Sequence, residues 1–340
     1  MNNVDDTSNS LKTSPLSSED HPSLLAVIIE TNPQAWAQIQ DQITFKEAIQ
    51  ALLVFINGHI AVNNQNQVCV IASHPDSAQF LYPINKIDPR AGTTITTTVS
   101  EHLSTSTYSI AHAQSMYKQF RDVDEAVNKQ LKKLFELNNN TCHDSNTNDK
   151  SSALSGAFSL ALTYMNKVCA ISQESRMRSR ILVLSVASDL DAQYIPIMNS
   201  IFAAQSHRIP IDVCKLSGSP SFFQQACDST NGVYMKIKHP HGLVQYLLSA
   251  YAIDPELRPH INLSTQRDVD FRATCFITKR VVDIGFVCSV CLCIMSIILP
   301  TNECPMCGTH FQKDAIKKLT VSPVVQPPKK KKKKKKVEGQ

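Results

Sequence analysis

Four short stretches of this sequence are apolar at nearly every position, and they limit the possible folds more than any other feature. A strand covered by helices on both faces shows such a run, whereas a strand with one wet face alternates apolar and polar side chains. Segments with apolar residues three and four positions apart, typical of amphipathic helices, separate the runs. The sequence therefore predicts an α/β fold with a doubly wound, mostly parallel sheet. The predicted strands are Leu24–Ile29, Val68–Ala72, Ile181–Ala187 and Ile209–Leu216.

Further segments complete this pattern. Gln79–Tyr82 is expected as an edge strand and Val233–Ile237 as the last strand. Two polar stretches, 83–109 and 138–150, lack apolar anchors and are expected as surface insertions. The helices are predicted at Thr44–Ile60, His112–Leu137, Ala153–Val168, Ile195–Ala204, Ser221–Asp228 and Gly242–Tyr251.

Composition along the chain divides it into five regions. Residues 1–22 are polar and bury too little apolar surface to fold, so we expect a disordered leader before the α/β domain of residues 23–253. Two prolines and a polar stretch indicate a linker at 254–270. A cysteine-rich module is expected at 271–315, followed by a disordered basic tail at 316–340.

The cysteine-rich module carries two Cys-x-x-Cys pairs, Cys288 with Cys291 and Cys304 with Cys307. Zinc prefers four tetrahedral thiolate or imidazole ligands, and each pair offers two sulfurs from one tight turn. Gly308 follows the second pair and can adopt the positive φ that such a turn uses. These four cysteines are therefore predicted to bind one structural zinc ion, with no open position for a catalytic water.

The residues of this module also allow other assignments. Cys293 and His310 are spare donors, and either could replace one of the four ligands, although Cys293 is expected to be a buried thiol. Too few donors are present for a two-zinc RING of the ubiquitin-ligase type. Ile284–Asn302 is uncharged and apolar, close to the length of a membrane span, but Pro300, the serines and the ligand cysteines fit a span poorly.

The charge of the chain is concentrated at one end. Lys329–Lys336 supply eight of the 34 basic residues, which leaves 26 basic against 29 acidic residues elsewhere, a net charge of −3. The body is thus not a basic nucleic-acid-binding surface. The lysine run is interpreted as a nuclear-import signal, with a phosphate-binding or merely solubilising tail as alternatives. With eleven cysteines and no secretory signal, an intracellular protein with reduced thiols is expected.

No catalytic motif is recognisable in the sequence. Phosphate-binding glycine loops, a Gly-x-Ser-x-Gly elbow and a His-Glu-x-x-His motif are all missing. Asp189 and Asp191 follow a predicted strand at the edge where α/β proteins bind ligands, and they are the remaining acidic candidates. Their alternative role is capping of the next helix. A non-enzymatic protein is expected.

The loop Glu30-Thr31-Asn32-Pro33-Gln34 after the first strand, together with the order of elements, resembles a von Willebrand A domain. In that family the first loop reads Asp-x-Ser-x-Ser and holds magnesium. Here Glu30, Asn32 and Gln34 stand at the matching positions, and Ser151 or Ser152 only loosely matches the second-loop threonine. A longer carboxylate and two amides fit octahedral Mg²⁺ poorly, so bound magnesium is not expected.

A von Willebrand A domain with this altered loop, followed by four paired cysteines, resembles one subunit family of the core of general transcription and DNA repair factor IIH (TFIIH). Leu24–Pro33, Tyr194–Gln205 and Gly285–Cys291 are similar to segments of that family, and the likeness covers residues 23 to about 312. The resemblance implies a nuclear, non-catalytic scaffold in RNA polymerase II transcription initiation and nucleotide excision repair. It implies as partners the other von Willebrand A and zinc-bearing core subunit and the remaining TFIIH subunits, two helicases among them.

Two alternatives stay open beside this resemblance. The cysteine pairs and the lysine run also suit an autonomous zinc-ribbon protein that binds nucleic acid. The domain resemblance alone would suit an integrin-like, metal-dependent adhesion module. Contact with DNA, if any, is expected to be indirect or through the lysine tail, and no contact with a membrane is expected.

Overall fold

The computed structural model describes residues 21–75, 77–87, 94–96, 111–141, 152–171, 177–187, 194–218, 220–263, 269–278 and 280–312. The chain forms two compact units that part between Phe271 and Arg272. Asp189 and Asp191, Ser151, the leader up to residue 20 and the lysine run lie outside the described residues, as do most of the 83–109 and 138–150 stretches.

The first unit is built on a six-stranded sheet with the order β3-β2-β1-β6-β7-β8. All neighbouring strands are parallel except β3, which pairs antiparallel with β2 at one edge. The predicted mostly parallel sheet, its edge strand and its last strand are confirmed. The strands are β1 (Ser23–Glu30), β2 (Gln67–Ser73), β3 (Ala78–Tyr82), β6 (Arg178–Ser185), β7 (Ile211–Lys215) and β8 (Tyr234–Lys236), with a separate pair β4 (Asn85–Ile87) and β5 (Thr94–Thr96).

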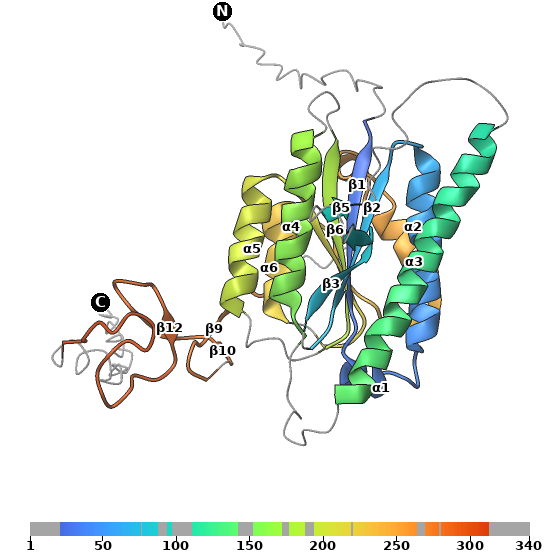
Figure 1. The fold of residues 1–340 in the computed structure, drawn as a ribbon. Coiled ribbons are helices and arrows are strands. Elements are labelled where there is room, and N and C mark those ends of the chain that lie inside the picture. The colour runs from blue at the N-terminus through green and yellow to red at the C-terminus, as the bar shows by residue number, and fades with distance from the viewer. Residues whose placement is uncertain are drawn as a thin grey trace, which may run out of the picture. The chain divides into compact units, whose positions relative to one another are not determined.

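Helices cover the sheet in two layers. Figure 1 shows α4, α5 and α6 on one side of the strands and α2 and α3 on the other, which is the doubly wound arrangement. All six predicted helices are present, although the last one changes along its length from a 3-10 helix to an α-helix and then to a π-helix. The helices are α1 (Pro33–Gln38), α2 (Phe45–Val62), α3 (Ala111–Thr141), α4 (Leu154–Ile171), α5 (Tyr194–Ser206), α6 (Ser221–Thr230), η3 (Pro240–Gly242), α7 (Leu243–Tyr246), η4 (Leu247–Tyr251) and η5 (Arg258–His260).

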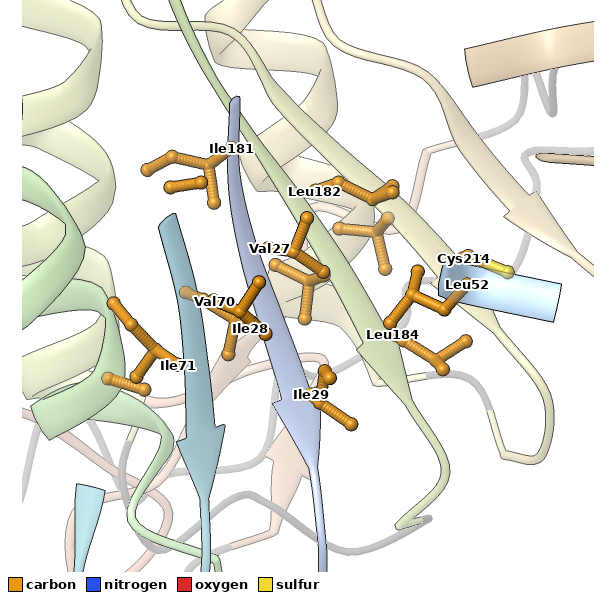
Figure 2. Packing of buried hydrophobic residues seen from close by; sticks show 14 of the residues in the cluster. Val27, Ile28, Ile29, Leu52, Val70, Ile71, Ile181, Leu182, Leu184 and Cys214 are labelled. Carbon is orange, nitrogen blue, oxygen red and sulfur yellow. The ribbon is translucent and has the colours of Figure 1, made fainter. Parts of the chain in front are cut away.

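The central strand β1 fixes the core. Each side chain from Leu24 to Ile29 is at most 1% exposed, as a strand between two helical layers requires. Figure 2 shows how neighbouring strands and a helix meet this strand. The labelled partners of Val27, Ile28 and Ile29 are Val70 and Ile71 from β2, Ile181, Leu182 and Leu184 from β6, Cys214 from β7 and Leu52 from α2.

Helix α2 begins at a capping box. The Thr44 hydroxyl accepts a hydrogen bond from the Glu47 backbone N–H at 3.3 Å, and the Glu47 carboxylate accepts one from the Thr44 N–H at 3.0 Å. By length and composition α2 is the one helix in the described part of the chain that could cross a membrane, and its Ala48, Leu52 and Ile56 are core residues.

Where the chain leaves the sheet domain, arginine side chains hold residues 254–260 and the helix end before them against the domain. The Arg258 guanidinium makes two hydrogen bonds of 2.7 Å to the carboxylate of Asp212, and both side chains are largely buried. Arg180 donates to the carbonyl of Tyr251 at 2.7 Å. The first part of the segment expected as a linker is therefore anchored by charged hydrogen bonds.

The second unit contains two short hairpins, β9 (Ala273–Thr274) with β10 (Val281–Val282) and β11 (Phe286–Val287) with β12 (Ile294–Met295). Its small core consists of Cys288, Cys293, Met295 and Cys304, with Phe276 and Phe311 packed beside it. Turns and short strands occupy 284–302, so the alternative of a membrane-spanning helix there is wrong.

Candidate metal centre and a closed polar site at the sheet edge

The four cysteines of the two Cys-x-x-Cys pairs converge in the second unit. The sulfurs of Cys288, Cys291, Cys304 and Cys307 all lie within 4.8 Å of one another. The Cys288 and Cys307 sulfurs are 3.7 Å apart, and those of Cys291 and Cys304 are 3.5 Å apart. A zinc ion about 2.3 Å from each of four tetrahedral thiolates places the sulfurs about 3.8 Å apart, so the cluster has the size of a zinc site.

Each pair lies on the same kind of turn. The N–H of Cys288 donates to the carbonyl of Cys293 at 3.0 Å, and the N–H of Cys304 donates to the carbonyl of Thr309 at 2.9 Å, which is a five-residue step in both cases. The fourth residue after the first cysteine of each pair has a positive φ, 57° at Leu292 and 71° at Gly308. The sequence predicted this backbone at Gly308, and the structure confirms it there. The sequence did not indicate a positive φ at Leu292, because leucine rarely adopts one.

Hydrogen bonds favour the thiolate form at two of the four cysteines. The side chain and backbone of Thr309 lower the pKa of the Cys307 thiol to about 6. The backbone N–H groups of Cys291 and Val290 lower the pKa of Cys288 from its ordinary value. A cysteine must lose its proton to bind a metal, so these contacts prepare the cluster for a cation.

The two spare donors lie apart from this cluster. Cys293 is 7% exposed and belongs to the small apolar core, as a buried thiol does. His310 is exposed, and its Nδ1 is 3.3 Å from the Glu303 carboxylate. Neither is among the grouped sulfur and nitrogen ligand atoms of the described residues.

A second polar cluster lies at the carboxyl edge of the sheet, where the strand order switches direction next to β1. Its centre is Glu30, which is fully buried at the end of β1. The first carboxylate oxygen accepts a hydrogen bond from the Ser152 hydroxyl at 2.6 Å. The second accepts from the Ser185 hydroxyl at 2.8 Å and from the N–H groups of Val186 and Ala187 at 2.8 and 3.0 Å. Four donors therefore surround this one carboxylate.

A buried ammonium group closes the same cluster. Lys215, at the end of β7, is fully buried, and its Nζ donates to the Ser185 hydroxyl at 2.7 Å and to the carbonyl of Ala187. The Nζ also lies 5.5 Å from the centre of the Phe223 ring. Burial lowers the pKa of Lys215 to about 8, against the opposing effect of the Glu30 charge. Ser185 thus links a buried acid to a buried base.

The other residues of the first loop do not point into this cluster in the way the magnesium motif requires. The Asn32 side chain accepts the Gln34 N–H at 3.1 Å and caps α1, and Gln34 is exposed. The Trp36 indole N–H donates to the Glu30 carbonyl at 2.7 Å. Of the two serines proposed from the sequence, Ser152 contacts Glu30, and Ser151 lies outside the described residues.

Sequence reasoning missed Ser185 and Lys215, although a signal for both was present. Lys215 and Asp212 are the two charged residues within the predicted strand Ile209–Leu216, and Ser185 interrupts the apolar run Ile181–Ala187. A charge inside a strand that is covered on both faces needs a buried partner. The sequence did not single out that partner, because Glu30, Asp189 and Asp191 all follow predicted strands. In the structure Lys215 reaches Glu30 through Ser185, since β6 lies between β1 and β7.

A sheet of this order with helices on both sides, together with a following four-cysteine cluster, defines the class: a von Willebrand A domain followed by a small four-cysteine module. The family described as transcription factor Tfb4 matches residues 22–308. The chain belongs to the Tfb4 family.

Similar proteins cover almost the whole length. The general transcription and DNA repair factor IIH subunit TFB4 of Yarrowia lipolytica is 46% identical, over 95% of this chain and 97% of that protein. Its counterpart in Saccharomyces cerevisiae is 42% identical, over 90% of this chain and 91% of that protein. The crystal structure of the TFIIH p34 N-terminal domain is 33% identical, covers 68% of this chain and 98% of that chain, and superposes with a TM-score of 0.53.

Proposed function

We propose that this chain is a structural subunit of the TFIIH core and that it acts in transcription initiation by RNA polymerase II and in nucleotide excision repair. The observation that carries this is the 46% identity that extends over 95% of the chain and 97% of a protein named as a TFIIH subunit. Because both the sheet domain and the cysteine module lie within the matched length, the role of the whole relative applies to the whole chain. The site of action is the nucleus.

The four-cysteine cluster holds one zinc ion in this proposal. Four thiolates at tetrahedral spacing suit Zn²⁺, and they leave no open position at which a water or substrate could bind. The ion would join two turns of a unit that has few apolar side chains of its own. Its role is therefore architectural.

The sheet-edge cluster takes no magnesium in this proposal. Glu30 is fully buried and already accepts four hydrogen bonds, and the Lys215 ammonium supplies the positive charge that a cation would bring. Mg²⁺ would need several oxygen ligands free in octahedral geometry. The cluster therefore stabilises the domain and catalyses nothing.

Scaffolding is the function that such a chain can perform. The two polar clusters present neither a nucleophile nor a general base to a substrate, because one is closed by its own chain and the other by its metal. The partners within TFIIH are the other von Willebrand A and zinc-bearing core subunit and, through it, the remaining subunits with their helicases. The catalytic steps belong to those partners.

Affinity purification of the full chain with an epitope tag, followed by identification of the co-purifying proteins, tests this function. We expect the TFIIH core subunits, including the helicases, in stoichiometric amounts at 150 to 300 mM salt, a range in which tail-mediated nucleic-acid contacts weaken by roughly tenfold or more. A tagged chain that ends before the lysine run is the matched control and should recover the same proteins. Recovery of nucleic acid without those subunits would instead support the zinc-ribbon alternative.

A further inference from the structure

The second unit contains a third turn of the same kind as the two that carry the cysteine pairs. The N–H of Cys275 donates to the carbonyl of Arg280 at 2.8 Å. This is the same five-residue step that joins Cys288 to Cys293 and Cys304 to Thr309. The three turns therefore begin at a cysteine and close with the same backbone hydrogen bond.

The sulfur of Cys275 is held as a metal-bound thiolate is held. Cys275 is fully buried, and its sulfur accepts hydrogen bonds from the Ser296 N–H at 3.1 Å, the Ser296 hydroxyl at 3.1 Å and the Thr278 N–H at 3.4 Å. The Thr278 N–H comes from the third residue after the cysteine. At Cys288 the N–H of Cys291, also the third residue along, makes the equivalent contact.

Two hydroxyl groups lie beside Cys275, where thiolates would bring the number of sulfur ligands to three. Thr278 stands where Cys291 and Cys307 stand in the other two turns. Its Oγ1 lies 3.4 Å from the Ser296 Oγ, which itself lies 3.1 Å from the Cys275 sulfur. Spacings of 3.5 and 3.7 Å separate the paired sulfurs of the four-cysteine cluster. The geometry of the ligand positions is thus similar, and the chemistry of two of them differs.

Serine and threonine hydroxyl groups bind zinc much more weakly than thiolates do. A thiol loses its proton near neutral pH when it meets a metal, and a soft thiolate suits Zn²⁺, whereas a serine or threonine hydroxyl stays protonated and binds weakly. Protonated hydroxyls can instead donate hydrogen bonds. At Cys275 such donors point positive charge at the sulfur, which is the effect that a cation would have.

We propose that Cys275, Thr278 and Ser296 form a second, metal-free counterpart of the zinc site, in which hydrogen bonds replace the ion. The site takes a thiophilic divalent cation, Zn²⁺ or Co²⁺, when Thr278 and Ser296 are both replaced by cysteine. In the native unit, the hydrogen bonds from Ser296 to the Cys275 sulfur join the β9–β10 hairpin to the end of β12 without a second ion.

Metal stoichiometry of the full chain under reducing conditions tests this proposal. T278C/S296C should raise the bound zinc by one equivalent relative to the unmodified chain. Titration with Co²⁺ should show a second set of thiolate-to-cobalt absorption bands. The control T278C/T301C adds the same number of thiols but places only one beside Cys275, and it should keep the native stoichiometry. An unchanged metal content in T278C/S296C would overturn the proposal, whatever the native content is.

A second measurement uses the native ligand set and does not depend on a new site. Ser296→Ala removes the hydroxyl donor to Cys275, so hydrogen exchange at the Thr278 and Ser296 amides should become faster while the zinc content stays as in the unmodified chain. Loss of zinc from Ser296→Ala would show that Ser296 supports the four-cysteine cluster. Unchanged hydrogen exchange at the two amides would show that the hydrogen bond from the Ser296 hydroxyl to Cys275 does not stabilise this site. Either result contradicts a separate hydrogen-bonded site.

Discussion

The two polar clusters of this molecule solve the same electrostatic problem in opposite ways. At the sheet edge the chain supplies both signs of charge, since the buried Glu30 carboxylate and the buried Lys215 ammonium share Ser185. In the cysteine cluster the chain supplies four sulfurs and no cation. A buried charge is costly unless it is paired, so the first cluster is complete within the fold, and in our proposal the second takes its cation from outside.

The surroundings explain why each solution suits its unit. The sheet domain has an extensive core on both faces of β1, and Glu30 and Lys215 are both buried at its edge. Among the described residues, the apolar cluster at the centre of the cysteine unit consists of Cys288, Cys293, Met295 and Cys304. A unit this small buries too little apolar surface to fold alone, and a structural metal is the usual remedy. We therefore expect a substitution in one cluster to change the stability of its own unit and to leave the other unit unchanged.

Removal of zinc should give the largest effect. Cys304→Ser takes away one of four ligands, and a structural zinc ion contributes about 10–16 kcal/mol of binding free energy in zinc-finger peptides. We expect the metal to be lost and residues 272–312 to unfold, while the sheet domain keeps its melting temperature. Elemental analysis together with hydrogen exchange of both units measures this.

Cys293→Ala is the matched control, because Cys293 is a buried cysteine of the same unit that lies outside the ligand cluster. It should keep one equivalent of zinc. If Cys304→Ser left the second unit folded, or lowered the melting temperature of the sheet domain as much as that of the module, the contrast between the two regions would be lost.

The reverse experiment removes the cation that belongs to the chain. Lys215→Met keeps the length of the side chain and removes the two hydrogen bonds that the Nζ donates to the Ser185 hydroxyl and the Ala187 carbonyl. Each buried group left without its hydrogen-bond partner costs about 1–3 kcal/mol. The free energy of unfolding of the sheet domain should fall by that amount for each of the two groups in urea denaturation, while the zinc content of the module stays unchanged.

The double variant Glu30→Gln with Lys215→Met separates a charge effect from a packing effect. With both charges gone, the domain should be more stable than with Lys215→Met alone, because an amide is less costly to bury than an unpaired carboxylate. Equal stability of the single and double variants would mean that the two charges are not coupled.

Hydrophobic pattern was enough to predict the sheet, its edge strand and the helical layers, because strands covered on both faces cannot look otherwise. The grouping of the four cysteine sulfurs was also predictable, since the two members of each pair are close in sequence. Helix α1 was not predicted: it is six residues long, and its start depends on the Asn32 cap and on Pro33. Such a short element has no periodicity to detect.

The sheet-edge cluster was predictable only in part, for a physical reason. Glu30, Ser185 and Lys215 come from three strands that are far apart in the chain, and only the strand order β1-β6-β7 brings their ends together. The sequence indicated Glu30 through its place after a buried strand. It could not show that Lys215 lies 30 residues beyond Ser185 yet donates to its hydroxyl.

The pH dependence of stability provides a finer test of the chain's own cation. Lys215 has a pKa of about 8 in the folded domain, against an ordinary value of 10.5. Between these values the unfolded chain holds the proton and the folded chain does not, so the free energy of unfolding rises with pH, by up to about 3 kcal/mol. Denaturant titrations from pH 7.5 to 10.5 should show this rise in the unmodified domain and not in Lys215→Met. If the free energy of unfolding changed with pH in the same way in both proteins, the proton released in this range would belong to a group other than Lys215.

The smallest effect should come from one donor to Glu30. Ser152→Ala removes the 2.6 Å hydrogen bond to the first carboxylate oxygen and leaves the three donors to the second oxygen in place. A hydrogen bond to a charged group is worth about 1.5–3 kcal/mol, so the domain should lose that much, less than with Lys215→Met.

Ser200→Ala is the control, since its hydroxyl makes a neutral contact of 3.1 Å with the Pro196 carbonyl on the outside of α5, and such a change stays within about 0.5 kcal/mol. If the two serine variants were equally stable, Glu30 would not depend on its hydrogen bonds. The charge of Lys215 alone would then account for the closed site.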